Sequence, residues 1–341
     1  MKAKLSHILF ILLVMVCFIT LTTDYSSAFS YIRTPQDIYG VAPGAKKFNL
    51  NAKPDFGGTL TYSSSDNSLA KIDEKGNVTV GKKEGTAIIT ISENKESEIV
   101  NSKTVKIRIT AYKTPSGLMA QSNWNYDHKT GDKKNVDSFV SKYKYLKNGY
   151  QEWNFIVRCT DPYISNHAAT ADAYIVKNPH FGYAQHLPTS QKSVNNRASI
   201  YNAVHKVVGD SPTSKRLKQI NSIKKYANAS CTPTILAGYW LYVDMGSDIS
   251  LPWIFPYNKK SYTYKCGSVN VEYHQLEKAI KQVNKEYKNK GKLEPFEIIY
   301  VPANKRSAWF STGSMKKHLY RGDIVCCCLN YKKGGHTSLV L

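Results

Sequence analysis

Carboxylates are scarce in this chain. Its 341 residues include 25 Asp and Glu against 47 Lys and Arg, which leaves a formal net charge of +22 at pH 7. A charge excess of this size attracts polyanions without any specific site. Because the N-terminus predicts export, we expect an anionic cell-wall polymer as the partner and no specific nucleic acid. A solvated, lysine-rich surface is the alternative explanation of the charge.

Long hydrophobic runs are lacking beyond the N-terminus. Lys2 and Lys4 precede an apolar run over residues 8–21, and Ser26-Ser27-Ala28 then supplies the small residues that a signal peptidase cuts after. No later segment approaches the roughly 20 apolar residues that a membrane span requires. The sequence therefore predicts a signal peptide over residues 1–28 and a secreted or cell-wall protein that does not span the membrane once the signal is removed.

Cysteine is infrequent, with seven residues of which Cys17 lies in the leader. The chain is long and has no C-x-x-C pair, so neither a disulfide scaffold nor a tetrahedral zinc site is expected. In a strand, the consecutive residues 326–328 are expected to be small buried hydrophobes. A structural disulfide between Cys159 and Cys266 is the open alternative for that pair.

Residues 31–112 lack cysteine, tryptophan and histidine altogether. Val105, Ile107 and Ile109 alternate with polar residues, as the half-buried strand of a sheet does. Residues 86–91 form a more continuous apolar run, and residues 77–80 are bounded by glycines. Short strands separated by turns predict a small β-sandwich.

Four pieces of this region occur in an order that resembles a known family. They are Leu-Thr-Tyr-Ser-Ser-Ser-Asp at 60–66, Leu-Ala-Lys-Ile-Asp at 69–73, Gly-Asn-Val-Thr-Val at 76–80 and Gly-Thr-Ala at 85–87. Together they resemble the bacterial immunoglobulin-like domains of the intimin and invasin type, over most of residues 31–113. The resemblance implies a spacer, wall or adhesion module without catalysis.

The rest of the chain alternates helical and strand patterns. Residues 114–166 are interpreted as a linker or an N-terminal extension of a second domain. Residues 166–176 predict a helix that ends before Asn178-Pro179, and Leu217, Ile220 and Ile223 share one face of an amphipathic pattern. Further on, apolar spacing predicts a helix from Leu276 and a buried strand over residues 296–301.

Cys231 lies where a helix is expected to begin, with Pro233 in its first turn. The N–H groups and dipole at a helix start favour a thiolate. His336 follows the turn at residues 332–335 and begins a strand, from which an imidazole can take the thiol proton. Burial of the cysteine for packing and exposure of the histidine at the surface are the structural alternatives.

The order of these pieces resembles the NlpC-type cell-wall cysteine peptidases, which are papain-like. The resemblance rests on Cys231, Gly322-Asp323-Ile324-Val325 and Gly335-His336-Thr337. The resemblance implies that Cys231 is the nucleophile and His336 the base. The segment Asn178-Pro179-His180-Phe181-Gly182-Tyr183-Ala184-Gln185 resembles the Gly-Tyr-x-Gln segment that precedes the nucleophile in several members, which implies that Tyr183 lies near the oxyanion or the substrate.

Four features depart from that family. Ser230 occupies the position before the nucleophile where aspartate is common, the spacing from Tyr183 to Cys231 is long, and residues 250–310 are interpreted as an insertion. The family's third polar residue, which orients the histidine, lies on a strand after it, but this sequence stops at Leu341 inside an apparent strand. The interpretations are a chain truncated at its C-terminus, an orienting residue from elsewhere, or a degenerate site.

We therefore expect a multidomain protein in which an all-β immunoglobulin-like sandwich precedes an α+β papain-like domain at residues 167–341. The expected activity is hydrolysis of an amide bond in the peptide part of peptidoglycan, with no metal or cofactor required. The alternative is a non-catalytic wall-binding or surface protein with a degenerate cysteine site.

Overall fold

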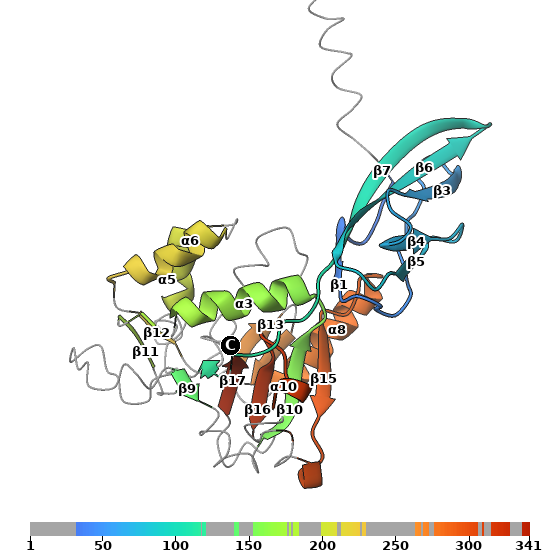
Figure 1. Ribbon diagram of the computed structural model, residues 1–341. Coiled ribbons are helices and arrows are strands. Elements are labelled where there is room, and N and C mark those ends of the chain that lie inside the picture. The colour runs from blue at the N-terminus through green and yellow to red at the C-terminus, as the bar shows by residue number, and fades with distance from the viewer. Residues whose placement is uncertain are drawn as a thin grey trace, which may run out of the picture.

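The computed structural model shows two units joined along one chain (Figure 1). It describes residues 32–116, 118–120, 140–142, 153–175, 177–178, 180–183, 199–209, 213–225, 227–229, 263–266, 269–272, 276–305, 309, 315–327 and 336–341.

The N-terminal unit contains two sheets that enclose one core. The first sheet has the strand order β1-β7-β6-β3, with β1 parallel to β7 and the other pairs antiparallel. Its strands are β1 (Ile38–Val41), β3 (Thr59–Ser64), β6 (Gly85–Lys95) and β7 (Glu98–Ile109). The second sheet has the order β2-β5-β4, from β2 (Phe48–Asn49), β4 (Ala70–Ile72) and β5 (Asn77–Val80). The predicted sandwich of short strands is confirmed.

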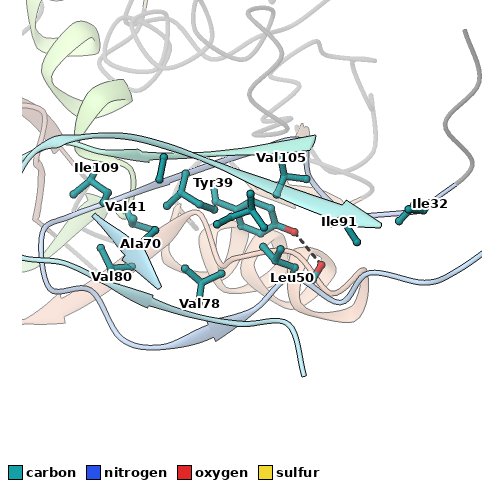
Figure 2. Close-up of a cluster of buried hydrophobic side chains, with 13 residues drawn as sticks. Ile32, Tyr39, Val41, Leu50, Ala70, Val78, Val80, Ile91, Val105 and Ile109 are labelled. Atoms are coloured by element: carbon teal, nitrogen blue, oxygen red, sulfur yellow. Dashed lines mark hydrogen bonds between the residues drawn. The ribbon is translucent and has the colours of Figure 1, made fainter. Parts of the chain in front are cut away.

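Alternating side chains form the core of this sandwich (Figure 2). Val105, Ile107 and Ile109 are all buried, as their spacing in the sequence predicts. Tyr39 is completely buried, its ring stacks on Phe48, and its hydroxyl donates a 3.1 Å hydrogen bond to the carbonyl oxygen of Leu50. Burying each large apolar side chain stabilises the fold by about 1.5–3 kcal/mol, so this alternation suffices to hold the two sheets together.

The C-terminal unit is built on one six-stranded antiparallel sheet, in the order β15-β10-β16-β17-β8-β9. The strands are β8 (Leu118–Ala120), β9 (Val140–Lys142), β10 (Trp153–Cys159), β15 (Phe296–Tyr300), β16 (Ile324–Cys327) and β17 (His336–Val340). Two short pairs accompany it: β11 (Phe181–Tyr183) with β12 (Ala227–Ala229), and β13 (Thr263–Cys266) with β14 (Val269–Glu272).

One sequence prediction about this sheet is confirmed only in part: residues 296–300 form a strand, and Phe296 and Val301 are buried. The apolar run at residues 296–301 predicts a buried strand, but β15 ends the strand order and Tyr300 is 49% exposed. Apolar composition does not distinguish an edge strand from a central one, because the neighbours come from distant parts of the chain. The strand pairs with β10 in the main sheet, so residues 296–300 are part of that sheet.

The C-terminal unit also contains helices. They are α3 (Pro162–Ile175), α5 (Ser199–Val208), α6 (Ser214–Lys218), α8 (Leu276–Asn289) and α10 (Met315–His318), with 3-10 turns η3 (Gln219–Ser222) and η4 (Ala303–Lys305). Of these, α3 and α8 contact the six-stranded sheet, whereas α5 and α6 contact each other and η3. Helix α3 runs across the strands in Figure 1 and contacts β10 and β17. No helix in the described part of the chain is both long and apolar enough to cross a membrane.

Helix α3 begins four residues earlier than the sequence predicts. Its N-terminus is capped by Asp161, whose carboxylate accepts a 3.0 Å hydrogen bond from the backbone N–H of Tyr163. Pro162 occupies the first helical position, where the missing N–H has no intrahelical acceptor anyway. The predicted end of the helix before Asn178-Pro179 is confirmed.

The two units meet at a polar junction. Arg108 of β7 forms a 2.6 Å ion pair with Asp161, and its guanidinium lies 3.8 Å from the centroid of the Tyr163 ring. The backbone of Gly40 packs so closely against the Asp161 carboxylate that a side chain at residue 40 would overlap it. The sandwich therefore contacts the very residue that caps α3.

The segment between the units is hydrogen-bonded into the second one. The Tyr112 hydroxyl donates to the carbonyl of Cys159 at 2.8 Å, and the N–H of Ser116 donates to the carbonyl of Leu341 at 2.7 Å. Strands β8, β9 and β10 come from the region between residues 114 and 166 and pair within the six-stranded sheet.

Candidate functional site

Strands β11 and β12 bring two predicted site segments together. They pair in parallel, with Tyr183 opposite Ala229. Cys231 follows Ala229 by two residues and lies outside the described residues, so its position stays untested. The structure nevertheless places the strand that carries Tyr183 beside the chain that leads into Cys231, although the two segments are far apart in the sequence.

Asn178 holds this strand pair in place. Its side chain is 1% exposed, and its amide nitrogen donates to the carbonyl oxygens of Ile220 at 2.6 Å and Ile223 at 3.0 Å. Its side-chain oxygen accepts a hydrogen bond from the backbone N–H of His180 at 2.9 Å. One amide thus ties the turn before β11 to the segment that precedes β12. From the sequence, Asn178 is interpreted as the end of a helix and the start of the segment at residues 178–185, and its role in tying these two segments together is not predicted.

His336 is the first residue of β17, opposite Cys327 of β16. The predicted start of a strand at this residue is confirmed, and only its backbone is described. Strand β17 lies in the six-stranded sheet, whereas β11 and β12 form a separate pair. The proposed contact between Cys231 and His336 therefore stays a prediction.

The Gly322-Asp323 pair sets the geometry of β16 and β17. Gly322 has a φ of +90°, a conformation that favours glycine, and a Cβ atom there would overlap Ser165 of α3. The N–H of Gly322 donates to the carbonyl of Val340 at 2.8 Å, and the N–H of Val340 donates to the carbonyl of Asp323 at 2.9 Å. This pair therefore fixes the end of the strand that begins with His336.

Asp323 is structural in this arrangement. Its carboxylate is fully buried and accepts hydrogen bonds from the Arg158 guanidinium at 3.0 and 2.8 Å and from the backbone N–H of Tyr320 at 2.8 Å. Burial raises the pKa of the Asp323 carboxyl, and the Arg158 guanidinium opposes that rise. The expected resemblance to NlpC-type peptidases draws attention to this aspartate, but its arginine partner is apparent only in three dimensions.

Two stacked aromatic rings lie beside the arginine of this ion pair. The Arg158 guanidinium lies 4.4 Å from the centroid of the Tyr320 ring and 5.6 Å from that of Tyr112, and the two rings are stacked 4.8 Å apart. Burial also raises the pKa of the Tyr112 hydroxyl, so it stays protonated and donates its hydrogen bond to Cys159. The cluster joins the end of the sandwich to the sheet that carries His336.

Asp172 of α3 is a buried carboxyl that sequence reasoning missed. Its side chain is completely buried, and neither carboxylate oxygen has a hydrogen-bond partner. Burial raises its pKa well above the ordinary value, because the low-dielectric surroundings disfavour the charged form. The only sequence signal is an aspartate on the same helical stripe as the buried Ala168 and Ala169.

Cys159 is a free cysteine with a completely buried side chain. The alternative of a disulfide to Cys266 is therefore wrong for this structure. Burial raises the pKa of the Cys159 thiol, so it is not a competing nucleophile. Over the described ranges, no group of three His, Cys, Asp or Glu side chains is arranged to hold a metal ion.

Comparison with known families identifies part of the sandwich. Residues 51–95 match the family described as "Intimin, immunoglobulin-like domain". The N-terminal unit contains an intimin-type immunoglobulin-like domain. The match spans all of β3, β4, β5 and β6, where the four resembling segments lie, and confirms that part of the sequence prediction. No curated protein matches the chain. The papain-like assignment of residues 167–341 is not carried by the match and stays a prediction.

Proposed function

We propose that this protein is an exported peptidoglycan hydrolase that cleaves an amide bond in the wall peptide by a Cys-His mechanism. The observation that carries the proposal is the parallel pairing of β11 with β12. It supports the proposal because it sets Tyr183, the residue expected near the oxyanion, beside the segment that enters Cys231.

The reaction begins with the Cys231 thiolate attacking the carbonyl carbon of the amide after His336 has taken the thiol proton. His336 then gives this proton to the nitrogen as the C–N bond breaks, which leaves a thioester on Cys231. Water, deprotonated by His336, attacks the carbonyl carbon of the thioester. The C–S bond then breaks, the product acid is released, and His336 returns the proton to the Cys231 sulfur. The backbone N–H of Cys231, assisted by Tyr183, stabilises the oxyanion of both tetrahedral intermediates.

The surroundings of His336 also support this assignment. Its strand is fixed at its far end by Gly322 and Asp323, and Asp323 is in turn fixed by Arg158. A histidine on a strand held in this way has a restricted position, as a general base requires. The orienting partner of the imidazole is not assigned.

Localisation rests on two independent features. The first is the predicted leader at residues 1–28, and the second is the intimin-type domain, a type associated with bacterial surfaces. Both agree with a protein of the cell wall or the exterior.

A second candidate function is a non-catalytic wall-binding or surface protein. The match of residues 51–95 favours it, because the domain supplies no catalytic group. In this case the cysteine site is degenerate, and Ser230 before Cys231 is one mark of that degeneration.

The test is release of peptide fragments from purified walls by the parent protein and by Cys231→Ala. We expect the variant to lose release completely while its thermal unfolding matches the parent. Cys159→Ala serves as the matched control, since it removes a buried thiol and should retain release. Wall digestion by Cys231→Ala at the parental rate would falsify the assignment, and a parent that releases nothing would favour the binding protein.

A further inference from the structure

The exposed side of helix α8 is basic. Lys281, Lys285 and Lys288 are exposed, whereas Val283 and Tyr287 are buried. The spacing of the three lysines, i, i+4 and i+7, places them along one side of the helix over about 10 Å. Among the α8 side chains that the structure describes, no carboxylate is fully exposed.

Two more cations lie opposite each other in the part of the sandwich close to α8. Arg33 and Lys53 form an isolated antiparallel bridge, with reciprocal backbone hydrogen bonds of 3.0 and 2.9 Å, and both residues are exposed. Directly opposed residues in such a pair have neighbouring side chains, and like charges there are destabilising. An anion between them would remove that repulsion.

The two basic segments meet at the junction between the units. Asn51 donates a 2.8 Å hydrogen bond to the carbonyl of Gly291, just beyond the end of α8. Lys53 follows Asn51 by two residues, and the N–H of Gly291 donates to the carbonyl of Lys288 at 2.9 Å. Figure 1 shows α8 next to the sandwich, near β1.

Four of these cations form no ion pair with another residue that the structure describes. Within the described ranges, the ion pairs use Lys47, Lys103, Arg108 and Arg158, and none uses Arg33, Lys53, Lys285 or Lys288. We call these last four residues the junction surface. Lys281 is left out because its ammonium lies over the Tyr300 ring, 5.5 Å from the centroid.

We propose that the junction surface binds a linear, phosphate-bearing polymer of the cell wall. Four cations without a described ion pair lie on two adjoining segments. A flexible polyanion can contact them one after another, because attraction between opposite charges does not require a pocket. The predicted export of the protein selects a wall polymer over a nucleic acid. This inference names a partner of the proposed wall enzyme, but the binding itself does not require Cys231.

The experiment measures binding of poly(glycerol phosphate) to the full chain by titration at several salt concentrations. The Cys231→Ala background keeps the measurement independent of any wall cleavage. The junction variant carries Arg33→Gln, Lys53→Gln, Lys285→Gln and Lys288→Gln. The matched control loses the same charge from four exposed lysines elsewhere, through Lys71→Gln, Lys82→Gln, Lys224→Gln and Lys225→Gln. Thermal unfolding of both variants checks that each is folded.

We expect the junction variant to bind roughly tenfold more weakly at physiological salt. The slope of the logarithm of the binding constant against the logarithm of salt concentration should be smaller in magnitude by about 3, because each of the lost contacts removes roughly 0.7. The control should bind close to the parent. Equal weakening of both variants would show that only net charge matters and would overturn the proposal. Tighter, junction-dependent binding of a DNA oligonucleotide than of poly(glycerol phosphate) would overturn the choice of partner. Failure of either kind leaves the Cys231 test unaffected, so the two proposals fail separately.

Discussion

Asp323→Asn should destabilise the second unit strongly. The substitution keeps the shape of the side chain but removes the charge that the Arg158 guanidinium contacts at 3.0 and 2.8 Å. Arg158 is 13% exposed and Asp323 is fully buried, so water cannot replace the lost carboxylate. The change leaves an uncompensated cation beside the stacked rings of Tyr112 and Tyr320.

The expected loss in the free energy of unfolding is about 3–5 kcal/mol, the usual cost of removing one partner of a buried ion pair. In a unit of roughly 200 residues, this lowers the melting temperature by about 10 °C. The double variant Arg158→Met with Asp323→Leu removes both charges. Its loss in the free energy of unfolding should be far smaller than the sum of the losses in the single variants Arg158→Met and Asp323→Leu.

The assay is urea unfolding followed by circular dichroism, with calorimetry for the melting temperature. Asp37→Asn is the control, because Asp37 also forms an ion pair, with Lys103, but is 75% exposed. We expect this control to lose at most about 1 kcal/mol. An Asp323→Asn variant within about 1 kcal/mol of the parent, or strictly additive single and double variants, would refute the reasoning.

Two further changes test the packing of α3. Asp172→Asn should raise the free energy of unfolding at neutral pH, because the folded-state pKa of Asp172 is raised and folding therefore opposes its ionisation. This gain should be absent below about pH 3, because an ordinary carboxyl with a pKa near 3.9 is then protonated in the unfolded chain too, and it should grow as pH rises. Urea titrations at several pH values measure the gain. A gain that does not depend on pH would contradict this cause. Gly322→Ala should cost at least about 2 kcal/mol, because a Cβ there meets Ser165 at a positive φ, and a melting curve unchanged from the parent would exclude this close contact.

Local periodicity predicted the sandwich well. The alternation of Val105, Ile107 and Ile109 marks their buried face, because a strand has a side-chain period of two whatever it pairs with. Helix α3 was predictable for a similar reason, although its start required the cap from Asp161. The strand start at His336 was also predictable, from the turn before it.

The candidate site was predictable only in part. Tyr183 and the segment before Cys231 were identified from short motifs, but their parallel pairing was not, because strand pairing joins residues distant in sequence. Asn178 was seen as a helix end and not as the residue that ties two segments together. A buried side chain's partners cannot be read from its own neighbours in the chain.

The excess of positive charge, the period-two strands of the immunoglobulin-like sandwich and the order of the motifs around Cys231 and His336 follow from the sequence alone, which also predicts a leader. Each of these is a local property, set by residue type and by the repeat of the backbone. The contact of Asp323 with Arg158, 165 residues away, and the hydrogen bond that joins Asn51 to Gly291 beyond the end of α8 are apparent only in three dimensions. Such contacts depend on how distant strands and helices pack, and neither composition nor spacing encodes that locally.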